Sequence, residues 1–238
     1  MHDTATDELQ AAPMTAPVVA RGLVKGFVAP DGSRVVAVDD VDFEAPAGEI
    51  TAIVGQSGSG KTTLLQLLAG LDKPDAGSVR LAGVEIAEVG DATVTRLRRR
   101  QVGFVFQAFN LVPGLSARDN IALPLRLDGR TVDEDRLQDL AGRLGIGNRL
   151  DHAPEQLSGG QRQRVAVARA LIAEPAIVFA DEPTGALDAA SAASLLEVLQ
   201  EAVEELSQTV VLVTHDLALA DLAAHVHVLQ AGRLERQR

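Results

Sequence analysis

Runs of apolar residues along the chain predict a set of buried strands. Residues 50–54, 176–180 and 209–213 are almost continuously apolar, which is typical of strands buried on both faces of a sheet. Two shorter β-like segments, Val18–Val19 and Val35–Val38, lie nearer the N-terminus on either side of a turn sequence. The long runs therefore predict a parallel core, and the N-terminal pair predicts an antiparallel sheet at its edge.

Polar starts and helical periodicity predict helices between these strands. A leucine-rich segment follows Lys61, and residues 189–206 are long enough to cross over between two apolar runs. Four further helices are predicted from their N-cap residues, namely Asp91 before Thr93–Gln101, Ser116, Thr131 in a capping box with Glu134 that runs to about Leu144, and Ser158. Strand, helix and strand in this order imply a parallel sheet, and the helical block at about 108–165 is expected to be an inserted subdomain.

Length and composition fit one α/β domain. The chain has 238 residues, of which 46% are hydrophobic, and this is enough for one full core. Residues 1–17 are rich in Ala, Thr and Pro and contain no Lys or Arg, so we expect a disordered tail ahead of a domain at 18–238. The longest uncharged run, Val102–Ala117, is too short and too polar to span a bilayer, so we expect no transmembrane segment.

The net charge and the absence of cysteine limit the kinds of partner and the kinds of site that the chain can have. The chain has 33 acidic and 22 basic residues, and this formal net charge of −11 argues against a broad nucleic-acid-binding surface. It has no cysteine, which excludes disulfides and cysteine–zinc sites and suits a reducing cytoplasm. Any bound nucleotide must therefore be held by local groups.

The segment Gly55–Thr62 has the pattern G-x-x-x-x-G-K-[ST] of a phosphate-binding loop. It lies between the apolar run at 50–54 and the leucine-rich helix, in the strand, loop and helix order that a phosphate cradle needs. Glycines let backbone N–H groups approach an anion, and the N-terminus of the following helix favours negative charge. Lys61 can then reach the terminal phosphates, and the Thr62 hydroxyl can bind Mg²⁺.

Two carboxylates, Asp181 and Glu182, directly follow the apolar run at 176–180. Open α/β sheets bind ligands at the carboxyl ends of their strands, which is where this pair is predicted to lie. Asp181 can hold the Mg²⁺ shell, and Glu182 can polarise a water for in-line attack on a γ-phosphate. Together with the phosphate loop, the pair predicts nucleotide hydrolysis.

Beside these motifs, Leu157–Gln161 (LSGGQ) resembles the signature of ATP-binding cassette (ABC) ATPases, and the resemblance covers essentially residues 18–238. Further positions match the family in order: Phe27 where the family often has an adenine-stacking tyrosine, Gln107 like the Q-loop glutamine, Ala186–Asp188 like the D-loop, and His215 like the switch histidine. The resemblance implies an α/β fold with a P-loop NTPase core and its parallel sheet, an antiparallel β edge subdomain and an inserted helical subdomain.

The resemblance also implies a composite ATP site made by two copies of the chain. In the family, two subunits meet head to tail, and the signature serine and glycines of one copy contact the γ-phosphate held by the other. The catalytic residues implied are Lys61, Gln107, Glu182 and His215, and the Mg²⁺ ligands implied are Thr62, Gln107 and Asp181. The residues implied to bind ATP are Phe27, Gly55, Gln56, Ser57, Gly58, Ser59, Gly60, Lys61, Thr62, Thr63, Ser158, Gly159, Gly160, Gln161 and Asp188.

Within the superfamily, Phe104–Pro113, Asn120–Leu125 and Ala180–Gly185 look most like the branch of lipoprotein-releasing, macrolide-exporting and cell-division ATPases. Two residues depart from this branch: Ala186 replaces an asparagine and bears on a contact across the dimer, and Thr62 replaces the commoner serine but keeps the hydroxyl. The resemblance predicts a cytoplasmic ATPase subunit that uses ATP and Mg²⁺, forms a homodimer and drives a separate transmembrane permease at the inner face of the membrane. We expect this system to export or extract a substrate.

Some features have a second interpretation. The rival function is a soluble, non-transport ABC ATPase acting on a macromolecular complex such as a ribosome or DNA, although such proteins usually carry two cassettes or a coiled-coil insertion. The arginines at 96–100 are more simply a solvated helix end than a phosphate site. His225 and His227, with no nearby carboxylate in sequence, are more simply structural than metal ligands. Phe27 has the alternative of a core position in the edge sheet.

Overall fold

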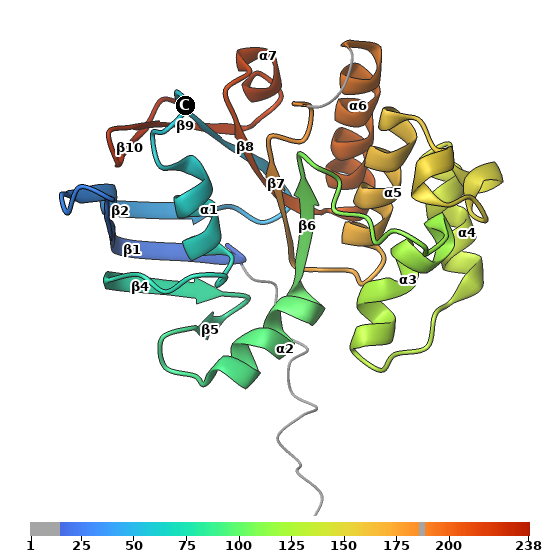
Figure 1. The fold of residues 1–238 in the computed structure, drawn as a ribbon, viewed down its shortest axis with the longest axis horizontal. Coiled ribbons are helices and arrows are strands. Elements are labelled where there is room, and N and C mark those ends of the chain that lie inside the picture. Colours follow the sequence, from blue (N-terminus) through green and yellow to red (C-terminus); the bar gives the residue numbers. More distant parts are fainter. Residues whose placement is uncertain (1–14, 186–188) are drawn as a thin grey trace, which may run out of the picture.

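The computed structural model describes residues 15–185 and 189–238, and its central feature is a six-stranded sheet with the order β10-β9-β3-β8-β7-β6. Five of these strands pair in parallel: β3 (Ile50–Val54), β6 (Val102–Phe106), β7 (Ile177–Asp181), β8 (Thr209–Thr214) and β9 (His225–Gln230). β10 (Arg233–Arg236) closes one edge in the antiparallel direction. The parallel core predicted from the apolar runs is confirmed (Figure 1).

A four-stranded antiparallel sheet with the order β2-β1-β4-β5 lies beside this core. Its strands are β1 (Val18–Val28), β2 (Arg34–Ala45), β4 (Ala76–Leu81) and β5 (Val84–Glu85). Helix α1 (Lys61–Leu68) packs between the two sheets, because its leucines share one hydrophobic cluster with Phe43 of β2 and Phe179 of β7. The antiparallel edge sheet predicted from the N-terminal segments is confirmed.

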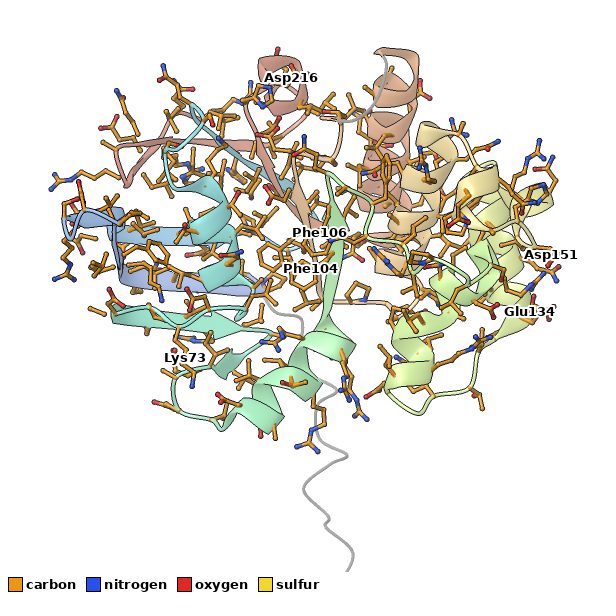
Figure 2. The ribbon with its side chains drawn as sticks, in the orientation of Figure 1. Lys73, Phe104, Phe106, Glu134, Asp151 and Asp216 are labelled. Carbon is orange, nitrogen blue, oxygen red and sulfur yellow. The ribbon has the colours of Figure 1, made fainter. Side chains whose placement is uncertain are left out.

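Side chains of the central strands alternate between two hydrophobic clusters. On β7, Phe179 packs on the α1 side and Val178 packs on the opposite side. The opposite side is covered by α3 (Ala117–Leu127), α4 (Glu134–Arg143), α5 (Gly159–Leu171) and α6 (Ala189–Leu206) (Figure 1). On β6, Phe104 and Phe106 stack with ring centres 5.4 Å apart (Figure 2). Burial on both faces explains why β3, β7 and β8 are almost continuously apolar.

The remaining elements are α2 (Asp91–Gln101), α7 (Leu217–Ala220) and two 3₁₀ turns, η2 (Gly147–Arg149) and η3 (Pro154–Gln156). Across residues 15–185 and 189–238, every helix is either too short or too polar to cross a membrane.

Two of the predicted helix starts are correct and two are wrong. Ser116 caps α3 and Ser158 caps α5, each by accepting a backbone N–H bond on its hydroxyl. α4 begins after Asp133, whose carboxylate accepts the first N–H groups of the helix, so the capping box predicted at Thr131 does not form. The N-cap of α2 is Gly90, and Asp91 lies inside the first turn, where its charge favours the helix dipole.

The arginines at the end of α2 connect this helix to its neighbours. Arg98 donates to the carbonyl of Gly70, which follows α1. Arg100 donates to Asp128 after α3 at 2.9 Å, and the Asp128 side chain is only 7% exposed. The prediction of a merely solvated helix end is therefore wrong, because two of these side chains bridge separate elements.

Strand β6 and helix α5 approach closely at Gly103. A Cβ atom there would lie 2.5 Å from the carbonyl oxygen of Ala170. Gly103→Ala is expected to lower the free energy of unfolding by about 1–3 kcal/mol, because the backbones must separate to admit the methyl group. Urea unfolding measures this change, with Gly142→Ala as the matched control.

At Gly142, inside α4, nothing lies within 4 Å of an added Cβ. The control is expected to gain up to about 1 kcal/mol from its better helix propensity. Equal unfolding midpoints for the two variants would contradict the close packing of β6 on α5.

Candidate functional site

The carboxyl ends of β3, β6, β7 and β8 bring most of the predicted residues into one cleft of about 750 Å³. Its lining is Phe27, Ala37, Gln56, Ser57, Gly58, Gly60, Lys61, Thr62, Thr63, Gln107, Glu182 and His215. Eleven of these twelve residues were predicted from the sequence, and Ala37 was not. The carbonyl of Ala37 belongs to β2, so only the fold could bring it to the cleft.

The phosphate loop is shaped by two close backbone contacts. A Cβ at Gly60 would lie 2.1 Å from the Ala37 carbonyl oxygen, and one at Gly55 would lie 2.4 Å from the Leu229 carbonyl oxygen. Gly60 also has φ 102°, which favours glycine. No side chain caps α1, and no acidic residue lies in its first turn. The helix N-terminus and loop are therefore suited to an anion.

Lys61, the first residue of α1, is buried and turns back over the loop. Its Nζ donates to the carbonyls of Gly55 at 2.8 Å and Gln56 at 3.0 Å. These neutral acceptors hold the ammonium group at the loop. A phosphate entering the loop would offer a charged acceptor, which makes a stronger hydrogen bond.

Asp181 and Thr62 form a site whose oxygens suit a small divalent cation. Thr62 Oγ1 donates to Asp181 Oδ2 across 3.4 Å, and the buried Asp181 Oδ1 has no hydrogen-bond partner among the described residues. Burial raises the pKa of the Asp181 carboxyl, with the neighbouring Glu182 adding to the effect. A bound cation would satisfy the unpaired oxygen and favour the carboxylate. Carboxylate and hydroxyl oxygens are ligands that Mg²⁺ prefers, so these residues fit that ion.

Glu182 is held against His215 at the edge of the cleft. His215 Nδ1 and Glu182 Oε2 are 2.8 Å apart, and Thr214 donates to the same oxygen across 3.4 Å. The Glu182 side chain is 18% exposed and that of His215 is 69% exposed. Glu182 also has φ 45°, a left-handed conformation that a non-glycine residue keeps only where its surroundings hold it. The contact with Thr214 was not foreseen from the sequence.

Gln107 directly follows β6 and packs on the turn after Glu182. A Cβ at Gly185 would lie 2.6 Å from Gln107 Nε2, so this glycine permits the contact. The cleft is therefore lined by segments that follow four separate strands, and Gln107 lies between the turn after Glu182 and the cleft.

The signature residues are not brought into the cleft. Ser158 Oγ accepts the backbone N–H of Gln161 at 3.3 Å, and Gln161 Oε1 accepts that of Ser158 at 2.9 Å. This reciprocal capping box starts α5. Gly159 and Gly160 form the first turn, and their N–H groups are directed as at any helix N-terminus. The predicted D-loop residue Asp188 lies outside the described residues.

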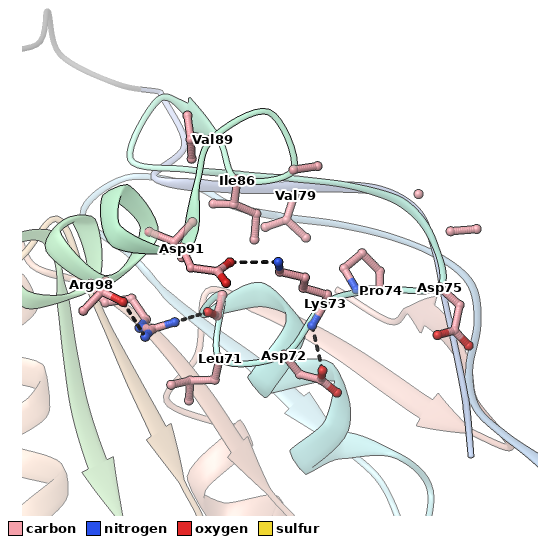
Figure 3. Close-up of a pocket in the computed structure, with 16 residues that line it drawn as sticks. Leu71, Asp72, Lys73, Pro74, Asp75, Val79, Ile86, Val89, Asp91 and Arg98 are labelled. Carbon is pink, nitrogen blue, oxygen red and sulfur yellow. Dashed lines mark hydrogen bonds and ion pairs between the residues drawn. The ribbon is translucent and has the colours of Figure 1, made fainter. Parts of the chain in front are cut away.

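A second hollow of about 520 Å³ lies between the end of α1, β4 and α2 (Figure 3). None of the predicted site residues lines it. Lys73 pairs with Asp91 at 2.8 Å, and Arg98 donates to the Gly70 carbonyl. Because these charged groups satisfy one another, the hollow does not present the converging unpaired groups of the first cleft.

The two histidines of β9 have structural partners. His225 Nε2 lies 2.7 Å from a carboxylate oxygen of Glu49, which is far from it in the sequence. Arg236 lies 2.9 Å from Nδ1 of the same histidine. The ring of His227 packs 5.4 Å from that of Phe43. Within the described part of the chain, no group of three or more histidines and carboxylates could hold a metal ion.

Comparisons with known proteins agree with this geometry. The family described as ABC transporter matches residues 38–185. The lipoprotein-releasing system ATP-binding protein LolD of Idiomarina loihiensis is 43% identical over 87% of this chain and 91% of its own length. The macrolide export ATP-binding/permease protein MacB of Nitrosomonas europaea is 44% identical over 90% of this chain, which spans about a third (33%) of that relative.

Solved structures give the same result at the level of the fold. A dimeric structure of MJ0796, described as a bacterial ABC transporter cassette, is 36% identical with a TM-score of 0.83 and covers 93% of this chain and 99% of its own. A second dimeric structure of the same cassette, in a post-hydrolysis state bound to ADP and Pi, matches equally well. The predicted α/β cassette fold is confirmed.

Phe27 is 45% exposed and lines the cleft, so its alternative interpretation as a core residue is wrong. Phe27→Ala is expected to weaken ATP binding roughly 5- to 100-fold, because stacking of a base on an aromatic ring contributes about 1–3 kcal/mol. Titration with a fluorescent ATP analogue measures this, with Phe27→Tyr as a control that keeps the ring. Equal affinity of the alanine variant would remove Phe27 from the base site.

His227 gives a prediction for the dependence of stability on pH. Burial lowers the pKa of His227 from 6.5 to about 4, with Arg236 and His225 adding to the effect. The unfolded chain therefore binds the proton more tightly, and the protein loses stability as the pH falls from 6.5 towards 4. Between pH 7 and 5 the wild type is expected to lose about 2 kcal/mol more than His227→Gln, as measured by urea unfolding. Parallel pH profiles of the two proteins would contradict the buried, neutral histidine.

Proposed function

The chain belongs to the ABC transporter family and is an ABC ATPase, and we propose that it is the dimeric nucleotide-binding subunit that drives a separate membrane permease. The observation that carries the proposal is the single cleft in which Lys61, Glu182 and His215 meet. Lys61 begins α1, Glu182 follows β7 and His215 follows β8, and together they supply phosphate binding, a base and a partner for that base.

The residues of the phosphate loop bind and orient the triphosphate. The N–H groups at the start of α1 face the phosphates, and the Lys61 ammonium moves its hydrogen bonds from loop carbonyls to phosphate oxygens. Phe27, which lines the same cleft, would stack on the base. Thr62 and Asp181, with Gln107, would hold Mg²⁺, which supplies neutralisation of phosphate charge when bound.

Glu182 acts as the general base for hydrolysis. Its carboxylate accepts a proton from the water that attacks the γ-phosphorus, while the bond to the leaving β-phosphate oxygen breaks. His215 donates from Nδ1 to Glu182, which orients the carboxylate. A ring that also carries a proton on Nε2 can donate it to the γ-phosphate. Gln107, packed on the turn after Glu182, would contact the attacking water and contribute a ligand to Mg²⁺.

A second copy of the chain completes the site. Ser158 and its glycines lie at the N-terminus of α5, outside the cleft of their own chain. A helix N-terminus with a serine N-cap suits a phosphate, so these groups would act on the nucleotide of the facing copy. The dimeric state of the 36% identical cassette supports this arrangement.

A membrane permease is the proposed partner to which ATP hydrolysis is coupled. The relatives named for lipoprotein release and macrolide export support a subunit that exports or extracts a substrate from the inner face of the membrane. The region after Gln107 would receive the permease, since a hollow of about 210 Å³ there is lined by Phe104, Phe106, Asn110 and Arg169 among others. We therefore propose a cytoplasmic location, with the chain bound to the membrane through its partner.

Replacement of Glu182 tests the chemistry. Glu182→Gln keeps the shape of the side chain but removes the base, so turnover is expected to fall by about 10²–10⁴-fold while ATP still binds. The measurements are phosphate release and binding of a fluorescent ATP analogue. Glu44→Gln, at an exposed glutamate that pairs with Arg21, is the matched control and is expected to behave as wild type. Near-normal turnover of Glu182→Gln would remove the assigned base.

A further inference from the structure

Gln163 is a fully buried polar residue on α5 that lies outside the ATP cleft. Its exposed fraction is 0%, and its Nε2 donates to the carbonyl of Pro183 at 2.8 Å. Among the described residues, its Oε1 has no hydrogen-bond partner. An apolar side chain of the same length would fill the space, but it would leave the Pro183 carbonyl without this donor, so the glutamine serves the backbone of the turn after Glu182. Packing alone therefore does not explain a glutamine here.

The Gln163 bond is made to the turn that carries the catalytic base. Glu182 has φ 45°, its N–H donates to Val213 at 2.8 Å, and its carbonyl accepts from Gly185 at 3.0 Å. Those two bonds fix the turn to β8 and to itself. The Gln163 amide adds a bond from a helix to the residue directly after Glu182. A left-handed non-glycine residue keeps its conformation only while such surroundings hold it.

Helix α5 supports the loop after Gln107 as well. Arg169 donates to the carbonyls of Phe109 and Asn110 at 2.8 and 2.5 Å, and the Arg162 guanidinium lies 5.1 Å from the centre of the Phe109 ring. Phe109 and Asn110 are also left-handed, with φ 61° and 48°. One helix thus holds two strained loops that reach the ATP cleft of its own chain.

Gln163 lies five residues after Ser158, which caps the same helix. We infer that Gln163 is a positioning residue for hydrolysis, because its hydrogen bond connects the turn after Glu182 to the signature helix α5. When Ser158 of one chain docks on the nucleotide of the facing copy, this connection aligns Glu182 of the first chain with the nucleotide that the first chain itself holds. This inference rests on the proposed function, because it assigns Glu182 as the base and the signature helix to the facing site. It adds a physical link between the two sites of a dimer.

The test compares two buried glutamines that each donate to a proline carbonyl. Gln208 donates to Pro175 at 3.1 Å, ahead of the opposite end of β7, and is 7% exposed. Gln163→Met is expected to lower kcat about 10- to 100-fold, because misplacement of a catalytic group by about 1 Å has effects of this size. Its KM for ATP should stay within about threefold of wild type, since the phosphate loop is untouched. Gln208→Met should keep kcat and lose a similar amount of thermal stability.

Combination with Glu182→Gln separates positioning from structural damage. If Gln163 acts through Glu182, Gln163→Met causes no further loss of turnover in the Glu182→Gln background. Further loss there, or equal kcat for Gln163→Met and Gln208→Met, would overturn the inference. If Gln163→Met does not fold, Gln163→Asn is measured instead, because its amide is one methylene too short to reach the Pro183 carbonyl. The same loss of kcat without a change in KM is expected for this variant.

The controls also distinguish this inference from the proposed function. Normal turnover of Glu182→Gln contradicts the base assignment itself, whatever Gln163 does. A large loss in Glu182→Gln together with wild-type kcat in Gln163→Met leaves the base in place and rejects only the positioning role.

Discussion

In-register pairing of four parallel strands is the interaction on which the site depends. The strand ends lie opposite one another in three pairs: Val54 with Thr214, Val213 with Asp181, and Asp181 with Phe106. The residues that follow each strand therefore emerge at one edge of the sheet. A slip of one residue would turn every side chain of that strand to the other face. The phosphate loop, the base and its histidine meet only because this register is kept.

The two faces of the central sheet support different parts of the site. On one face, α1 is enclosed between two sheets, which fixes the phosphate loop at its N-terminus. On the other face, α5 packs on β6 at Gly103 and carries the residues that hold the catalytic loops. Because α5 also begins at Ser158, a shift of this helix is transmitted to Glu182 and to the loop after Gln107.

Sequence alone predicted the parts of the site that are local. The phosphate loop and the carboxylates after β7 are short continuous segments with a sufficient pattern, and the resemblance to ABC ATPases added Phe27, Thr63, Gln107 and His215. Together these account for eleven of the twelve cleft residues. Ala37 and Gln163 could not be found in this way, because each acts through a backbone carbonyl or a bond between distant elements. The cap of α4 was misplaced because Thr131 and Asp133 are both good N-caps, and only the fold selects between them.

The cleft of one chain holds the phosphate loop and the base but not the signature, so ATP is expected to complete its site by joining two copies. Light scattering on Glu182→Gln protein, with and without Mg-ATP, measures this most directly. ATP is expected to raise the dimer fraction, and Ser158→Arg, which blocks the signature helix, is expected to abolish the increase. A mass that does not respond to saturating ATP, or an ATP-induced dimer that survives Ser158→Arg, would contradict it.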